Sequence, residues 1–229
     1  MRVSILTGQS SLLDGRIASG INKQPLTEPQ FCDIEGLVAD VQVSRSVHGG
    51  PERALHYYPK EHYAFWKMWF HGMGLTAPLA LLTAGGFGEN ISGERLVESQ
   101  ACIGDIYQLD EALVQISQPR SPCYKLNARF GYEAFSVLAQ ANGRVGWLLR
   151  VLETGLLNPQ ADMTLVSRPH PQMSVQRAAD IMFNRAFNAA DVQELAQLAS
   201  LSPSWRKKAE DYLREGQVAS WHRRLLGPV

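Results

Sequence analysis

Apolar and polar residues alternate in short segments through the first and larger part of the chain. Residues 103–118 (IGDIYQLDEALVQISQ) predict two strands joined at Asp110 and Glu111. Three further segments show the same pattern and are rich in β-branched or large apolar side chains: residues 36–44, 144–155 and 163–168. Many short strands at close spacing predict an all-β barrel or sandwich in this part of the chain.

One segment of this part has helical periodicity. In residues 58–72 (YPKEHYAFWKMWFHG), four aromatic residues recur at helical spacing: Tyr63, Trp66, Trp69 and Phe70. Pro59 suits the first turn of a helix, and Gly72 suits its end. We expect the aromatic face to pack on the strands rather than to bind a ligand.

After Arg168 the spacing of the apolar residues becomes that of α-helices. Residues 168–172 (RPHPQ) form a proline-rich joint, and three helical patterns follow at residues 174–183, 189–199 and 203–215. Ser174 and Ser202 are suitable N-caps, and Pro203 suits a first helical position. The chain is therefore predicted to be mainly β with α, with a β domain of residues 1–168 and a three-helix domain of residues 169–229.

Composition and charge narrow the function classes. The 229 residues are 45% hydrophobic and 19% charged, which is typical of a globular protein, and the net charge of zero gives no bulk attraction to nucleic acid or anionic membranes. Three acidic residues partly balance the four basic ones in residues 206–215, which favours a solvated helix face over a DNA-binding helix-turn-helix. The start of the chain does not resemble a signal peptide, and no apolar run is long enough for a membrane span, so we expect a cytoplasmic protein.

The three cysteines differ in their surroundings. Their odd number and wide spacing argue against a disulfide framework, and without a C-x-x-C pair a zinc or iron–sulfur site held by this chain alone is disfavoured. Cys102 lies beside Ala101 and Ile103, as a core thiol would. Cys123 instead lies in residues 118–129 (QPRSPCYKLNAR), which contain three cations and no acid. Nearby positive charge favours the thiolate, so Cys123 is a candidate nucleophile or metal ligand as well as a packing residue.

Two glycine-rich loops accompany this cysteine loop. Residues 46–55 (SVHGGPERAL) place Gly49 and Gly50 near Arg53, and residues 85–92 (GGFGENIS) place three glycines before Glu89 and Asn90. Glycine lets backbone amides approach a ligand closely, and arginine suits a phosphate in bidentate fashion. Neither loop has the spacing of a P-loop or of a dinucleotide-binding fingerprint.

Five motifs, in this order, resemble the MOSC domains of the YiiM type: VHGGPERAL, YPKEHY, FGENIS, the pair Gly104 and Asp105, and QPRSPCYKL. The likeness runs from about residue 5 to the C-terminus and includes the trailing helices. One departure is Glu52, where the family often has Asp.

The resemblance implies a MOSC-type β-barrel that binds molybdenum cofactor, a molybdopterin, with Cys123 matching the protein ligand to the metal. It also implies a reductase of N-hydroxylated bases such as hydroxylaminopurine, with electrons from a separate flavoprotein. From the motifs and their chemistry we expect these residues to bind the cofactor: His48, Gly49, Gly50, Arg53, Glu89, Asn90, Arg120, Ser121 and Lys125.

Other readings stay open at this point. The chain could store or deliver the cofactor without turnover, or it could be a metal-free transferase with Cys123 as nucleophile and His48 or His56 as base. Nucleic-acid binding by the C-terminal helices is disfavoured but testable through salt-dependent retention on DNA. The natural substrate, the identity of the electron donor and a homodimeric state are not determined by the sequence.

Overall fold

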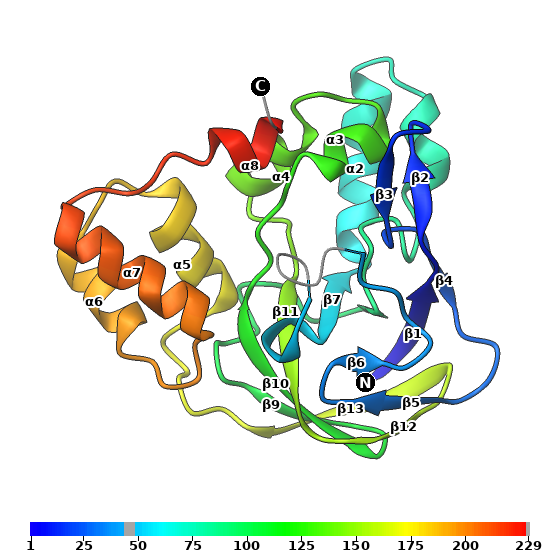
Figure 1. Ribbon diagram of the computed structural model, residues 1–229, viewed down its shortest axis with the longest axis horizontal. Helices are drawn as coiled ribbons and strands as arrows, with labels where there is room; N and C mark the ends of the chain where they lie inside the picture. Colours follow the sequence, from blue (N-terminus) through cyan, green and yellow to red (C-terminus); the bar gives the residue numbers. More distant parts are fainter. Residues whose placement is uncertain (44–48, 228–229) are drawn as a thin grey trace.

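A closed ring of strands forms the centre of the computed structural model, which describes residues 1–43 and 49–227. The order around the ring is β13, β9, β10, β11, β7, β8 and β1, and β1 pairs again with β13. Six of the seven junctions are antiparallel, and β7 and β8 are parallel, so the barrel is mixed (Figure 1). The seven strands are β1 (Arg2–Gly8), β7 (Leu55–Pro59), β8 (Ile91–Gly93), β9 (Ile106–Leu109), β10 (Ala112–Pro119), β11 (Trp147–Glu153) and β13 (Gln160–Ser167). The predicted fold, mainly β with α and centred on a barrel, is confirmed.

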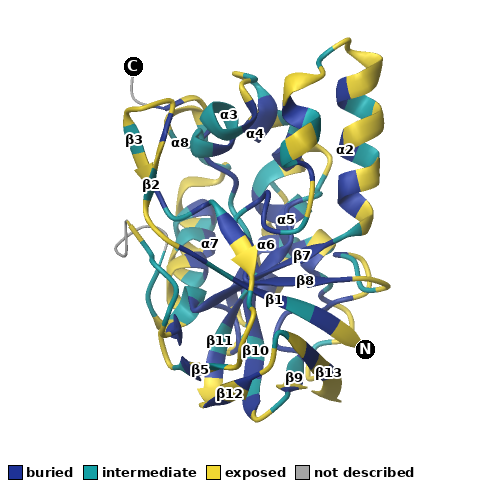
Figure 2. Cartoon of the chain, turned by 90° about the vertical axis from the view of Figure 1, so that its right-hand side faces the viewer, coloured by how far each residue is buried: buried dark blue, intermediate teal, exposed yellow. Residues whose placement is uncertain are grey.

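Apolar side chains at alternate positions along the strands fill the interior of the barrel. Val114 and Ile116 of β10 are fully buried, and they pair in register with Val151 and Leu149 of β11. Burying an aliphatic side chain of this size contributes roughly 1.5–3 kcal/mol. The buried residues of the strands converge on the centre of the ring (Figure 2). The strands predicted within residues 103–118, 144–155 and 163–168 are therefore confirmed.

The strand predicted at residues 36–44 is wrong over most of its length. Of residues 36–43, which the structure describes, only Gly36–Leu37 is in a strand, β6, and Val38 is 63% exposed. The cause is Asp40, whose carboxylate accepts hydrogen bonds from the N–H of Gly8 at 2.8 Å and from Nδ2 of Asn90 at 3.0 Å. Residues 38 and 39 form a turn in which the N–H of Asp40 donates to the carbonyl of Leu37 at 2.9 Å, and this turn ends the strand. The remaining short strands are β2 (Ser11–Leu13), β3 (Ile17–Ser19), β4 (Lys23–Pro25), β5 (Gln30–Asp33) and β12 (Gly155–Leu157).

A second hydrophobic cluster lies outside the barrel, around α2 (Glu61–Gly72). The predicted helix is confirmed, although Pro59 ends strand β7 instead of starting the helix. The buried face of α2 packs mainly on α3 (Lys125–Phe130), α4 (Phe135–Ala141) and the loop at Phe87, as well as on Tyr58 of β7. Trp66 is T-shaped to Phe135 at a centroid distance of 4.7 Å, and Tyr58 stacks on Phe87 at 4.1 Å.

The C-terminal helices lie against one side of the barrel (Figure 1). They are α5 (Val175–Ala179), which continues as a π-helix (Asp180–Asn184), α6 (Ala189–Ala196), α7 (Pro203–Glu215) and α8 (His222–Leu226). Ser174 accepts a hydrogen bond from the N–H of Arg177, and Ser202 accepts one from the N–H of Trp205, so both predicted N-caps are confirmed. Barrel residues such as Leu149 and helix residues such as Leu195 belong to one hydrophobic core. The division of the chain at residue 168 stays a prediction.

Helix α8 leaves the other C-terminal helices and packs beside α3 and α4. The carbonyl of Leu225 accepts hydrogen bonds from Asn127 Nδ2 at 2.9 Å and Ser136 Oγ at 2.6 Å. No helix in the described part of the chain has the length and apolar character to cross a membrane.

Candidate functional site

A cavity of about 660 Å³ lies where the barrel, the cysteine loop and the C-terminal helices meet. Most of its lining residues belong to the segments 19–23, 40–43, 87–90, 118–125, 204–208 and 220–224, and the others are Arg53, His56, Leu148 and Met182. Its volume lies within the range of roughly 300–1,000 Å³ that is usual for small-molecule sites. Segments far apart in the sequence therefore build one site.

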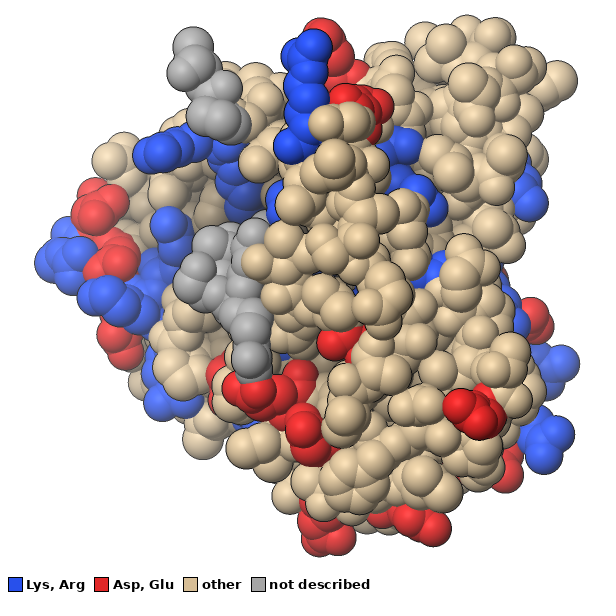
Figure 3. Space-filling view, turned by 45° about the vertical axis from the view of Figure 1, so that its right-hand side comes forward, with Lys and Arg blue, Asp and Glu red and all other residues tan. Residues whose placement is uncertain are grey.

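Positive charge dominates this cavity. The described lining contains one acidic residue, Asp40, and seven basic ones: Lys23, Arg53, Arg120, Lys125, Lys208, Arg223 and Arg224. Asp40 forms an ion pair with Lys23, so it is not available to the other cations. Lys and Arg side chains gather in and around a hollow in the upper part of the molecule (Figure 3). Such a cavity favours an anionic ligand.

Four cavity-lining residues carry a buried polar atom that has no hydrogen-bond partner among the described residues. Three are donors, Arg120 Nη1, Trp221 Nε1 and Arg224 Nε, and one is an acceptor, Gln42 Oε1. Buried polar atoms in folded proteins are nearly always paired, so these atoms indicate a polar ligand rich in acceptors. Burial also lowers the pKa of Arg120, and the nearby Cys123 opposes that shift.

Cys123 lies at the wall of this cavity, between a strand and a helix. Strand β10 ends at Pro119, and the N–H of Leu126 in the first turn of α3 donates to the carbonyl of Cys123 at 2.9 Å. The cysteine is 9% exposed and lines the cavity with Arg120 and Ser121. A thiol in the short connection between β10 and α3, among cations, can coordinate a thiophilic metal.

Two of the cations in the cysteine loop are also fixed by this fold. Lys125 lines the cavity, and its Nζ donates to the carbonyl of Ala18 at 3.1 Å. Arg129 turns away, because its guanidinium bonds Asn22 and the carbonyl of Gly86. The positive charge predicted from this loop is therefore brought to the cavity by Arg120 and Lys125.

In the second glycine loop, some residues stabilise the loop itself and others line the cavity. Glu89 is fully buried and accepts hydrogen bonds from Tyr63 Oη at 2.5 Å, from the N–H of Gly85 at 2.7 Å and from the N–H of Phe87 at 3.1 Å. It is not among the described cavity-lining residues, and its carboxylate instead shapes the loop. Gly88, with φ +76°, lines the cavity, and a Cβ there would lie 2.8 Å from the side chain of Ile21.

The first glycine loop contributes one described residue to the cavity. Arg53 lines it and donates to Ser204 Oγ at 3.3 Å. Gly49 and Gly50 are not among the described lining residues, and His48 lies outside the described part of the chain. A cofactor-binding role for these three residues stays a prediction.

Asn90, His56 and Lys23 line the cavity, and each is held by hydrogen bonds or an ion pair. Asn90 accepts from the N–H of His56 at 3.2 Å and donates to Asp40 at 3.0 Å. Burial, with Arg120 and Lys23 nearby, holds the pKa of His56 well below its ordinary value, so His56 is neutral. Burial also lowers the pKa of Lys23, despite its ion pair with Asp40.

The sequence analysis missed the contribution of the C-terminal helices. Trp205 and Lys208 of α7 line the cavity, and so do Trp221 and Arg224 beside the cysteine loop. Lys208 Nζ lies 4.8 Å from the centroid of the Trp221 ring, and Arg224 Cζ lies 4.4 Å from it. A local signal was present in residues 221–224 (WHRR), where an aromatic residue precedes two arginines.

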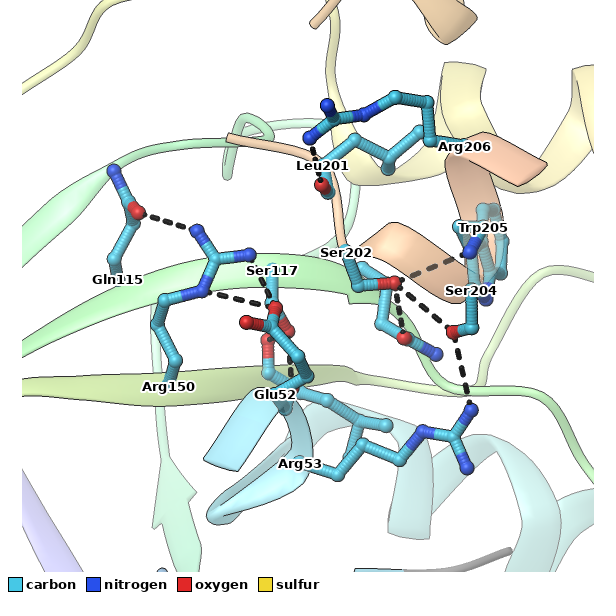
Figure 4. A network of polar contacts seen from close by, with 12 residues as sticks. Glu52, Arg53, Gln115, Ser117, Arg150, Leu201, Ser202, Ser204, Trp205 and Arg206 are labelled. Atoms are coloured by element: carbon cyan, nitrogen blue, oxygen red, sulfur yellow. Dashed lines mark hydrogen bonds and ion pairs between the residues drawn. The ribbon is translucent and has the colours of Figure 1, made fainter. Parts of the chain in front are cut away.

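Polar contacts hold α7 against the barrel beside the cavity (Figure 4). Ser202 Oγ donates to Gln118 Oε1 at 2.6 Å, and the N–H of Ser202 donates to the carbonyl of Ser117 at 2.9 Å. Ser117 Oγ in turn donates to the carbonyl of Glu52 at 2.6 Å, in the turn that carries Arg53. Residues from the barrel, the first glycine loop and α7 are thus fixed relative to one another.

Comparison with known proteins gives a consistent result. The MOSC domain family matches residues 44–164, and the YiiM-like 3-alpha helix domain matches residues 173–216. Protein YiiM of Escherichia coli is 41% identical over 225 residues, which are 98% of each chain. A protein of Gibberella moniliformis named "Reductase" is 37% identical over 187 residues, 81% of this chain and 32% of that protein. The crystal structure of YiiM from Escherichia coli superimposes with a TM-score of 0.82 at 35% identity, covering 99% of this chain and 100% of that one.

Proposed function

The chain belongs to the MOSC family, with the YiiM-like three-helix domain, and on this premise we propose that it is a molybdenum-cofactor-dependent reductase of N-hydroxylated compounds. The observation that carries the proposal is the cavity in which Cys123 lies among cations and unpaired donors. The name of the fungal relative supports the reaction class. We propose hydroxylaminopurine-like base analogues as the substrate class.

The cavity suits a molybdopterin. Cys123 would offer a soft thiolate ligand to molybdenum, a metal that binds sulfur donors. The unpaired donors of Arg120, Trp221 and Arg224 suit the phosphate and the acceptor atoms of the pterin, and Gln42 Oε1 suits a ring N–H. Gly88 and Asn90 let the ligand lie close to the loop backbone.

Reductive cleavage of an N–O bond consumes two electrons and two protons and yields an amine and water. When bound, the molybdenum cofactor supplies the two electrons. The chain's own residues orient the reactants and exclude water, since the C-terminal helices cover one wall of the cavity. Lys23 lines that cavity, and because burial lowers the pKa of its ammonium, we propose Lys23 as the donor of one of the two protons.

The electrons come from outside this chain in our proposal. Its sequence has no C-x-x-C pair, no haem attachment motif and no dinucleotide fingerprint. We therefore propose a separate flavoprotein as the electron donor.

The test is to prepare the protein with molybdate and with tungstate, and to measure metal, pterin and reductase activity with an artificial electron donor. We expect activity with hydroxylaminopurine only in the molybdate preparation. Bound molybdopterin without turnover on any N-hydroxylated substrate would support a carrier protein instead. Activity that is indifferent to molybdate, with a covalent adduct at Cys123, would support a cysteine transferase.

A further inference from the structure

In the segment after α7, Arg224 contacts both neighbours of Cys123 in the chain. Its guanidinium donates to the carbonyl of Pro122, the residue before Cys123. Its own carbonyl accepts from the N–H of Tyr124, the residue after Cys123, at 2.9 Å. One side chain and its backbone therefore hold the cysteine from both sides.

Several contacts fix Arg224 itself. Its guanidinium also donates to Gln140 Oε1 of α4, and Cζ lies 4.4 Å from the ring centroid of Trp221 and 5.1 Å from that of Phe183. The next residue, Leu225, is buried, and its carbonyl accepts from Asn127 and Ser136. A planar guanidinium held by two acceptors and two rings has little freedom to move.

We infer that Arg224 is a positioning residue for Cys123, and that the C-terminal segment is part of the site. Both matched domain regions end at or before residue 216, so neither includes this segment. Without the contacts of Arg224, residues 122–124 would lose their links to α8, and the thiol would sample more orientations at the cavity wall. The role in metal binding rests on the proposed function, whereas the effect on the thiol does not.

The geometry also predicts which substitutions weaken the contacts between Arg224 and the cysteine loop. Lysine keeps the charge of Arg224 but offers a single ammonium, which cannot reach Pro122 and Gln140 with the fork geometry of a guanidinium. Gln140→Leu removes one acceptor and leaves Arg224 in place. Arg214, on the exposed side of α7 and paired with Asp211, provides a matched control for the loss of an arginine.

The first test measures alkylation of Cys123 by iodoacetamide in metal-free, full-length protein at one fixed pH, by mass spectrometry of its peptide. Arg224→Lys should raise the rate roughly tenfold to a hundredfold, as expected for loss of a charge-assisted hydrogen bond, and Gln140→Leu should raise it less. Cys32 and Cys102, both buried, serve as internal controls whose rates should not change. Arg214→Ala should match the wild type at all three cysteines.

Two results would overturn the inference. One is a rate at Cys123 that stays at the wild-type value in Arg224→Lys, and the other is a rise at all three cysteines together, which would indicate general loosening. If Arg224→Lys gives no folded protein, the rate in Gln140→Leu decides by the same criteria.

A second test measures how well the protein retains molybdenum. Loaded Arg224→Lys protein should lose molybdenum on dialysis faster than the wild type and Arg214→Ala. If the wild type takes up no molybdenum, the proposed function fails, while the alkylation rates still decide the positioning role. If the wild type is loaded and Arg224→Lys retains metal and thiol protection equally well, only the positioning role fails.

Discussion

Ser202→Ala should destabilise the protein more than the loss of a helix cap alone. Ser202 is fully buried, caps α7 through the N–H of Trp205, and donates to Gln118 Oε1 of β10 at 2.6 Å. Losing an N-cap typically costs about 1 kcal/mol. Leaving the Gln118 oxygen buried without this donor costs about 1–3 kcal/mol more. We therefore expect the free energy of unfolding to fall by about 2–4 kcal/mol.

Ser174→Ala is the matched control, because Ser174 caps α5 through the N–H of Arg177 and its side chain makes no second hydrogen bond with any described residue. It should cost only about 1 kcal/mol. Urea unfolding followed by far-UV circular dichroism gives both values at one pH. Equal losses for the two variants would refute the reasoning that the Ser202–Gln118 bond ties α7 to the barrel wall.

Three further expectations follow from the site. Arg53→Ala and Arg120→Ala should each weaken cofactor retention by roughly one to two decades, measured as pterin remaining after gel filtration, with only partial recovery in the lysine variants; full retention in both alanine variants would make these arginines structural. The lowered pKa of His56 means that below about pH 6.5 the unfolded chain binds a proton that the folded chain does not, so the free energy of unfolding falls as the pH falls. Urea unfolding should therefore show a flatter pH profile in His56→Gln than in the wild type, and identical profiles would contradict this. NADPH or NADH alone should give no turnover until a flavin reductase or an artificial donor is added, and robust turnover with the nicotinamide alone would contradict the proposed electron route.

The barrel could be predicted because its strands carry the period-2 alternation that a closed sheet imposes, as in Val114 and Ile116. The short helices α3 and α4 could not, because their apolar residues, such as Phe130 and Phe135, pack against α2, which is distant in the sequence. The strand expected at residues 36–44 failed for a similar reason. Asp40 is drawn inward by donors at Gly8 and Asn90, which are distant in the sequence.

The residues of the candidate site could likewise be predicted only in part from the sequence. Local chemistry pointed to six residues that the structure places at the cavity: Arg53, Asn90, Arg120, Ser121, Cys123 and Lys125. Their cofactor contacts remain a prediction. Glu89 looked like a ligand-binding residue, yet donors from its own loop and from Tyr63 engage its carboxylate. Lys208, Trp221 and Arg224 were missed because only the path of the chain back to the cysteine loop brings them to the cavity.

The central claim is that Cys123 binds molybdenum, and the most direct measurement is the molybdenum content per chain of wild type and Cys123→Ser made side by side with molybdate. Cys32→Ser and Cys102→Ser are the controls, since Cys32 is fully buried with a pKa raised to about 12 by burial, and Cys102 is buried beside Pro171. The account predicts metal and reductase activity in the wild type and in both controls, and the loss of both in a folded Cys123→Ser protein. A Cys123→Ser protein that retains its molybdenum and full activity would contradict it.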